Sequence, residues 1–313
     1  MPAAESDLRL VSPKASGLEM SHENYLAEWP SLQFSFIVLW GASLIVGWRP
    51  LVDTLKLALG NYEYTHLVLI PPISAVLIVL EWRSLTPMME ANRRVGSALM
   101  ATAVLIGALV AMSSGSFPSD VRLSIEMIAL VLSWIGIFLF CFGSRVSRLV
   151  LFPLCFLFGL VPFPELILTH IVRLLQQGSA FAAHGLFSAI GVPVVQNGVM
   201  LTIPGLTLEV AKECSSIRSS SMLMVTTMVL AQLVLRSPWR KGLVMAVAIP
   251  LSVAKNGLRI FTIAMLAIRV DPAYLTGRLH RQGGIVFFAI ALIGIFLMLW
   301  ILQRRENVSH QKV

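Results

Sequence analysis

The sequence predicts an all-α integral membrane protein with about eight transmembrane helices, an interfacial amphipathic helix and a small β-meander on the outer side. Hydrophobic residues make up 57% of the 313 residues and charged residues only 13%, a balance that soluble globular domains do not have. The apolar residues are gathered into runs of helix length, and roughly 20 such residues cross a bilayer as a helix. Most Lys and Arg residues stand between these runs, as in the loops of membrane proteins. The chain therefore needs membrane lipid as its surroundings.

Eight apolar runs are the predicted spans. They lie near residues 32–48, 64–81, 95–114, 123–143, 149–163, 215–235, 242–268 and 284–302. The fifth run is short, and the seventh is long and contains Pro250, which either kinks a helix or divides it. We expect a polar cytoplasmic N-terminal tail at 1–30, a membrane domain at 31–303 and a cytoplasmic C-terminal tail at 304–313.

The basic residues set the expected orientation. The loops after the second, fourth and sixth spans, together with the C-terminal tail, carry more Lys and Arg than the loops on the other side. By the positive-inside rule both termini then face the cytoplasm. We expect no cleavable signal peptide, because residues 1–30 are acidic and poor in apolar side chains. The formal net charge of +8 follows from this topology, so we expect no nucleic-acid partner.

The stretch 164–213, between the fifth and sixth spans, falls on the outer side and has two parts. In the first part, polar side chains recur every four residues beside apolar ones, the pattern of an interfacial helix: Glu165, Thr169, Arg173 and Gln177. In the second part, β-favouring residues at 193–210 surround Asn197-Gly198, a hairpin turn signal, and Pro204-Gly205. We expect a short antiparallel meander, whose exposed edge could hold an extended substrate segment.

The three cysteines, Cys141, Cys155 and Cys214, have spacings that fit no metal site. The first two lie inside apolar runs, where a small buried thiol is the simplest interpretation. Cys214 instead stands in a polar stretch, 213–221, that leads directly into an apolar run. At a helix N-terminus, unpaired N–H groups and the positive end of the helix dipole favour thiolate over thiol. Cys214 is therefore either a nucleophile or a filler residue in a serine-rich first turn.

The seventh apolar run contains two cations, Lys255 and Arg259, with Asn256 between them. Residues four apart share one helix face, and charged groups inside a span are costly unless they face the bundle interior, pair or serve a site. The alternative is that the cations snorkel toward the interface, which suits one cation better than two beside an amide. We expect Arg259 to be catalytic and Lys255 and Asn256 to bind substrate.

His280 stands just before the last span, on the same side as Cys214 and Arg259. Taken singly, it is typical of an interfacial side chain. Together the three residue types suit acyl transfer. A thiolate attacks a peptide carbonyl, an imidazole protonates the leaving amine, and a guanidinium steadies the oxyanion or holds the substrate. The other histidines form no ligand-spaced cluster and no phosphate-binding glycine loop is found, so we expect no metal and no cofactor.

Three segments resemble, in order, the three motifs of the exosortase/archaeosortase family of eight-transmembrane cysteine transpeptidases. They are Glu213-Cys214-Ser215-Ser216-Ile217-Arg218, then Asn256-Gly257-Leu258-Arg259, then His280 with Gly284 and Phe288. An earlier segment, Tyr64-Thr65-His66-Leu67 with Pro71-Pro72, is similar to the family's Tyr-Ser-His segment and its following proline. The resemblance covers roughly residues 30–303, and most of its weight lies in 190–290.

The resemblance implies a protease or transpeptidase on the outer (periplasmic) face of the cytoplasmic (inner) membrane. Such an enzyme recognises the C-terminal tripartite, PEP-CTERM-like sorting signal of an exported protein, cuts before its hydrophobic helix and passes the acyl group to an acceptor. By the resemblance, Cys214 is the nucleophile, and Arg259 and His280 are its partners. Ser216 stands where the usual motif has glycine, which affects substrate preference more than the chemistry.

Two expectations concern geometry. The three catalytic side chains should converge on one cleft near the outer membrane boundary. Arg218, one helical turn after Cys214, should face that cleft and attract the acidic residue of the sorting signal. The competing interpretation is that Arg218 only pairs with Glu209 or Glu213.

Two other classes of function remain open at this stage. A transporter could use Arg218, Lys255 and Arg259 to line an ion or anion path, and its flux should survive thiol alkylation. A noncatalytic component of a polysaccharide export system could use the same polar residues to bind another membrane protein. In that case, Cys214→Ser should be nearly silent.

Overall fold

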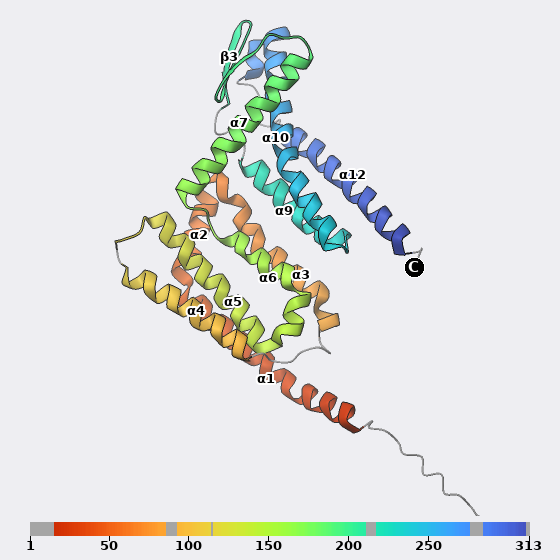
Figure 1. Cartoon of the computed structure of the whole chain (residues 1–313). Coiled ribbons are helices and arrows are strands. Elements are labelled where there is room, and N and C mark those ends of the chain that lie inside the picture. Colours follow the sequence, from red (N-terminus) through yellow and green to blue (C-terminus); the bar gives the residue numbers. More distant parts are fainter. Residues whose placement is uncertain (1–15, 86–92, 114, 211–216, 276–283, 311–313) are drawn as a thin grey trace, which may run out of the picture.

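The computed structural model describes residues 16–85, 93–113, 115–210, 217–275 and 284–310, and helices dominate it (Figure 1). In chain order the elements are α1 (Ser16–Val46), α2 (Trp48–Gly60), the 3-10 helix η1 (Tyr62–Leu69), α3 (Ile70–Leu85), α4 (Arg93–Met112), α5 (Ser119–Leu149), α6 (Leu151–Phe156), the 3-10 helix η3 (Leu157–Leu160), α7 (Glu165–Ala189), β1 (Val195–Asn197), β2 (Met200–Ile203), β3 (Leu206–Glu209), α9 (Ile217–Val234), α10 (Pro238–Arg269), the 3-10 helix η4 (Pro272–Leu275) and α12 (Gly284–His310).

Within the described residues, 6 helices are long and apolar enough to cross a membrane, and the count reaches 8 if each of two bent helix pairs is one span. The predicted all-α membrane fold with about eight spans is thereby confirmed. The seventh span is a single helix, α10, that contains Pro250 without being divided. Two helices reach further than the predicted spans: α1 begins at Ser16, inside the polar tail, and α12 continues to His310.

Each of the two pairs is sharply bent. Helix α7 turns by 99° from the helical stretch Leu151–Leu160. The helix predicted to start at Glu165 is confirmed and runs to Ala189, and its position in the membrane interface stays a prediction. Helix α2 turns by 69° from α1. The sequence analysis left this region between two spans without a helix, although Thr54 and Ala58 form a buried face on it.

The fifth predicted span is the least regular one. Helix α6 and η3 together rise only about 15 Å, roughly half of a bilayer's apolar layer. The stretch 161–164 that follows is not helical, and side chains from elsewhere satisfy its carbonyl groups. Ser124 Oγ donates to the Pro162 carbonyl at 2.8 Å, and Tyr64 Oη donates to the Phe163 carbonyl at 2.9 Å. Cys155, at the end of this short helix, is exposed, so its expected burial is wrong, whereas Cys141 is buried.

The predicted meander is confirmed as a three-stranded antiparallel sheet in the order β1-β2-β3. Asn197 pairs with Met200, so the first turn is Gly198-Val199, one residue later than predicted. The left-handed conformation that this turn needs falls on Gly198, with φ of 62°. Leu201 and Ile203 point inward and pack against α7 and α10. The side of the bundle that carries this sheet is called the meander side below (Figure 1).

Helix α10 organises the second half of the molecule, because it packs against α7, α9 and α12. Its crossing with α7 is close. A Cβ on Gly257 would lie 2.5 Å from the Ala182 Cβ and 3.0 Å from the Ala183 nitrogen, so glycine is required there. Away from the meander side, the Glu306 carboxylate of α12 accepts hydrogen bonds from the backbone nitrogens of Arg236 and Ser237, which lie between α9 and α10.

Candidate active site

Arg259 lies near the end of α10 on the meander side, where several chain segments meet. Its side chain is buried, with 8% exposed. It lines a small cavity of about 50 Å³ together with Val210, which follows β3, and Leu275 of η4. A Cβ on Gly284, the first residue of α12, would lie 3.9 Å from Arg259 Nη1. Segments far apart in the sequence are therefore held around one guanidinium.

Cys214 and His280 lie outside the described residues, within 211–216 and 276–283. The described residues that flank these two stretches are informative. Val210 and Leu275, the last residues before each stretch, line the Arg259 cavity, and Gly284, the first residue after the second stretch, lies against the guanidinium. Three of the four flanking positions are thus at Arg259.

The chain is fixed where it leaves the sheet. The Val210 nitrogen donates to the Val199 carbonyl at 3.0 Å. Gln176 of α7 donates from Nε2 to the Val210 carbonyl at 2.8 Å. The sequence analysis missed Gln176 and picked out its neighbour Gln177, which is exposed. The sequence shows two adjacent glutamines on the predicted interface helix. Only the folded structure shows that Gln176, and not Gln177, faces the meander.

Lys255 faces the interior of the bundle, with 6% of the residue exposed, and donates a hydrogen bond from Nζ to Ser219 Oγ on α9. One turn earlier on α10, Ser252 Oγ donates to Ser220 Oγ at 2.6 Å. These two contacts connect α10 to the first turns of α9, the helix that follows Cys214. The burial of both Lys255 and Arg259 excludes the alternative in which the cations snorkel to the interface.

Asn256 and Gly257 hold α7 against the other face of α10. Asn256 Nδ2 donates to Ser179 Oγ of α7 at 3.0 Å, and both residues are almost completely buried. Gly257 permits the close helix crossing described above. The segment Asn256-Gly257-Leu258-Arg259 therefore combines a packing function in its first two residues with a buried guanidinium in its last.

Arg218, at the start of α9, is exposed, and its guanidinium carbon lies 5.6 Å from the centre of the Tyr62 ring of η1. The sequence analysis did not foresee this cation–π contact, which joins the two halves of the chain. Of the two expected partners, Glu213 lies outside the described residues, and Glu209 is exposed at the end of β3.

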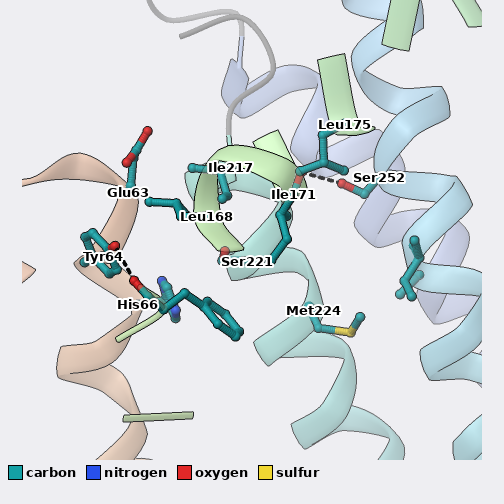
Figure 2. Close-up of a pocket in the computed structure, with 14 residues that line it drawn as sticks. Glu63, Tyr64, His66, Leu168, Ile171, Leu175, Ile217, Ser221, Met224 and Ser252 are labelled. Atoms are coloured by element: carbon teal, nitrogen blue, oxygen red, sulfur yellow. Dashed lines mark hydrogen bonds between the residues drawn. The ribbon is translucent and has the colours of Figure 1, made fainter. Parts of the chain in front are cut away.

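A cavity of about 330 Å³, here called the inner cavity, lies between η1, α7, α9 and α10 (Figure 2). Its walls are mainly apolar, and its polar lining consists of Glu63, Tyr64, His66 and three serines, Ser220, Ser221 and Ser252. The Tyr64 hydroxyl is already bonded to the Phe163 carbonyl. Tyr64 and His66, noted above for their resemblance to a family motif, thus belong to a cavity wall directly beside the start of α9.

An open cleft of about 990 Å³ lies beside the inner cavity, between α2, η1 and the first turns of α5 and α7. It has a charged lining, in which Arg122 pairs with Glu126 at 2.8 Å and Asp120 Oδ2 accepts from the Glu165 nitrogen at 2.7 Å. Glu63, Tyr64, Phe163 and Leu168 line both spaces, which are therefore adjacent. The sequence analysis did not foresee this cleft, because its lining comes from segments about 70 or more residues apart.

Comparison with known proteins gives one match. The family model described as transmembrane exosortase (Exosortase_EpsH) matches residues 58–297, well over half of the chain. Comparisons with curated proteins and with solved structures gave no significant match.

Proposed function

Since the chain belongs to the transmembrane exosortase family, we propose that it is a membrane-embedded cysteine protease or transpeptidase that cleaves the C-terminal sorting signal of exported proteins. The proposed reaction passes through a thioester intermediate. Its proposed place is the cytoplasmic (inner) membrane, with the meander side facing outward to the periplasm. The substrates are exported proteins whose tails carry a tripartite signal of the PEP-CTERM type.

One observation carries this proposal. Arg259 is buried, and Val210, Leu275 and Gly284 lie around it. These three residues border the stretches 211–216 and 276–283, which contain Cys214 and His280. A buried guanidinium needs a reason, because charge inside a membrane bundle is expensive unless it serves a pair or a site. The family motif and the geometry point to the same residue.

In the proposed reaction, the Cys214 thiolate attacks the carbonyl carbon of the scissile peptide bond. The negative charge moves to the carbonyl oxygen, where the Arg259 guanidinium stabilises it. His280 gives a proton to the nitrogen as the carbon–nitrogen bond breaks, so the leaving segment departs as an amine. An acceptor nucleophile then attacks the thioester carbonyl and gives its proton to His280, and the Cys214 thiolate leaves.

The three expected substrate-binding residues take different parts in this proposal. Lys255 and Asn256 act from inside the bundle, since their side chains are bonded to Ser219 and Ser179. They hold the start of α9 and the length of α7 against α10. Arg218 is exposed at the start of α9 and is available to the acidic residue of the sorting signal.

Mass spectrometry of the purified protein with a tail peptide tests this function. We expect a mass adduct on Cys214 equal to the acyl segment, released by hydroxylamine as a thioester is. Cys214→Ala is the matched control and should carry no adduct. An adduct on another residue, or undiminished cleavage by Cys214→Ala in cells, would falsify the proposed chemistry. Nearly silent Cys214→Ser would support a noncatalytic partner, and solute flux that survives thiol alkylation would support a transporter.

A further inference from the structure

The inner cavity lies along the first turns of α9 and along the part of α10 that precedes Lys255. Its wall on α9 consists of Ile217, Ser220, Ser221 and Met224, the first two turns of the helix. At about 1.5 Å per residue, these positions cover roughly 10 Å of depth. On α10 the lining residues come before Lys255 and Arg259 in the sequence, further from the meander side. The cavity thus starts beside Ile217, three residues after Cys214, and its lining residue nearest to Arg259 along α10, Ser252, stands about two helical turns before Arg259.

The walls of the inner cavity suit an apolar occupant. Leu168, Ile171 and Leu175 of α7 form one side, and Met224 of α9 also lines the cavity (Figure 2). Methionine adapts its shape to different partners, so this wall tolerates side chains of several shapes. Ile249, also in the lining, is 54% exposed on the surface of the bundle. The cavity is therefore placed to receive an apolar group that arrives from the lipid.

We propose that the inner cavity binds the first large apolar side chain on the leaving-group side of the scissile bond. This assignment rests on the proposed function and gives it a specificity site. When the scissile carbonyl of the substrate lies at Arg259, the chain segments on its two sides can follow different paths. The acyl segment can follow the meander, and the leaving segment, which begins a hydrophobic helix, enters the cavity on the membrane side.

The size of the cavity agrees with this occupant. A volume of about 330 Å³ corresponds to roughly ten water molecules, enough for one large aliphatic or aromatic side chain. The hydroxyls of Ser220 and Ser252, bonded to each other, form a polar edge beside the apolar walls. The first N–H groups of the hydrophobic helix in the substrate have no partner within that helix, and these hydroxyls can accept hydrogen bonds from them.

A size-exchange experiment tests the assignment. An exported reporter carries a PEP-CTERM-type tail with Ala, Leu, Phe or Trp at the first apolar position after the cut, and its cleavage is measured in cells. Ser221 faces the cavity, so Ser221→Phe should fill it (Figure 2). We expect cleavage of the Leu and Phe reporters to fall by about tenfold or more relative to the Ala reporter.

Two further variants complete that experiment. Met224→Ala enlarges the cavity and should shift the preference toward the Trp reporter. Ser221→Ala keeps the space open and should leave the size preference unchanged. Enzyme abundance is measured by immunoblot, and if Ser221→Phe does not accumulate, Met224→Ala decides the outcome. Equal changes for all four reporters, or none, overturn the assignment.

A photo-crosslinking experiment tests the occupant directly. Benzoylphenylalanine replaces Ile249 at the edge of the cavity or, as a control, Leu233, which is 56% exposed on α9 away from the lining. The Cys214→Ala background keeps the Leu reporter uncleaved. We expect position 249, and not 233, to crosslink to the reporter tail. Crosslinks from position 249 to lipid alone would identify the cavity as a lipid site and overturn the assignment.

The two proposals fail in different ways. If reporter cleavage persists in Cys214→Ala, the proposed function is wrong, whatever the size preference. If cleavage requires Cys214 but its size preference is the same in wild type, Ser221→Phe and Met224→Ala, only the specificity pocket is wrong.

Discussion

The helices before residue 161 and the helices after residue 165 bury polar groups in different ways. In the first half, the buried polar side chains among the described residues are hydroxyls, and Ser74, Ser124 and Ser147 donate to backbone carbonyls. In the second half, Lys255, Asn256, Arg259 and Glu306 are buried too. Buried hydroxyls that donate to backbone carbonyls have their hydrogen bonds satisfied and suit a stable fold. Buried cations instead lower the stability of the folded state. Among the described residues, the buried charged side chains thus belong to the second half.

The strongest test of this difference is Arg259→Lys. Lysine keeps the charge but loses the rigid fork of donors that can hold an oxyanion in two places. We expect reporter cleavage to fall by roughly a hundredfold to a thousandfold, the cost of losing one aligned oxyanion donor. Immunoblotted enzyme levels should stay close to wild type. Near-normal cleavage would show that Arg259 acts only through its positive charge. A loss of enzyme as large as the loss of cleavage would show that Arg259 has a structural role.

Lys255→Met separates stability from function. Methionine fills a similar volume without a charge, and replacing buried ions by apolar residues is often neutral or stabilising. Thermal unfolding in detergent should therefore show an unchanged or higher Tm. Cleavage should fall by up to about a hundredfold, because the start of α9 is no longer bonded to α10 through Ser219 and a shift of about 1 Å at a reacting group costs that much. Unchanged cleavage would mean that this buried cation has no part in the reaction.

A matched pair of glycine substitutions compares the halves directly. A Cβ on Gly257 would lie 2.5 Å from the Ala182 Cβ, and a Cβ on Gly96 of α4 would lie 2.5 Å from the Phe140 backbone of α5. Both Gly257→Ala and Gly96→Ala should destabilise the fold by about 1–3 kcal/mol through overpacking. Only Gly257→Ala should also lower cleavage per folded molecule, by roughly tenfold, since it moves α7 relative to the site. Equal activity losses in both variants would contradict the division.

The smallest effect is expected at the exposed Arg218. Arg218→Glu should reduce cleavage of a reporter with an acidic signal by about twofold to fivefold, the range of exposed charge pairs. A reporter with Lys in place of the acidic residue should recover part of that loss. If both reporters respond alike, Arg218 serves the contact with Tyr62 and not the substrate. Tyr62→Leu, assayed with the acidic reporter, is the matched control for that contact.

Hydropathy predicts the spans of this protein well because burial in lipid is a property of each segment alone. Contacts between segments are harder to predict. Gln176 reaches Val210 and Asn256 reaches Ser179 only after α7 has turned across the bundle. No local pattern predicts that turn, so the sequence analysis picked out Asn256 but neither Ser179, its partner, nor Gln176.

The same reasoning explains the helix at 48–60. The sequence analysis placed no helix in this short stretch between two spans. In the folded chain Arg49, Asp53 and Lys56 line the open cleft, while Thr54 and Ala58 are buried on the other face. The stretch therefore forms one wall of a cleft whose other walls come from distant parts of the chain.

The non-helical backbone at 161–164 adjoins the open cleft, which touches Pro162 and Phe163. Non-helical backbone is tolerated at membrane depth where protein covers it or a hydrated space adjoins it. Because the helical part of this span rises only about 15 Å, we expect water from the open cleft to reach this edge of the bundle. Lipids at this edge should be thinned or tilted to match. A hydrophilic acceptor could then approach a peptide whose next residues are still dissolved in hydrocarbon.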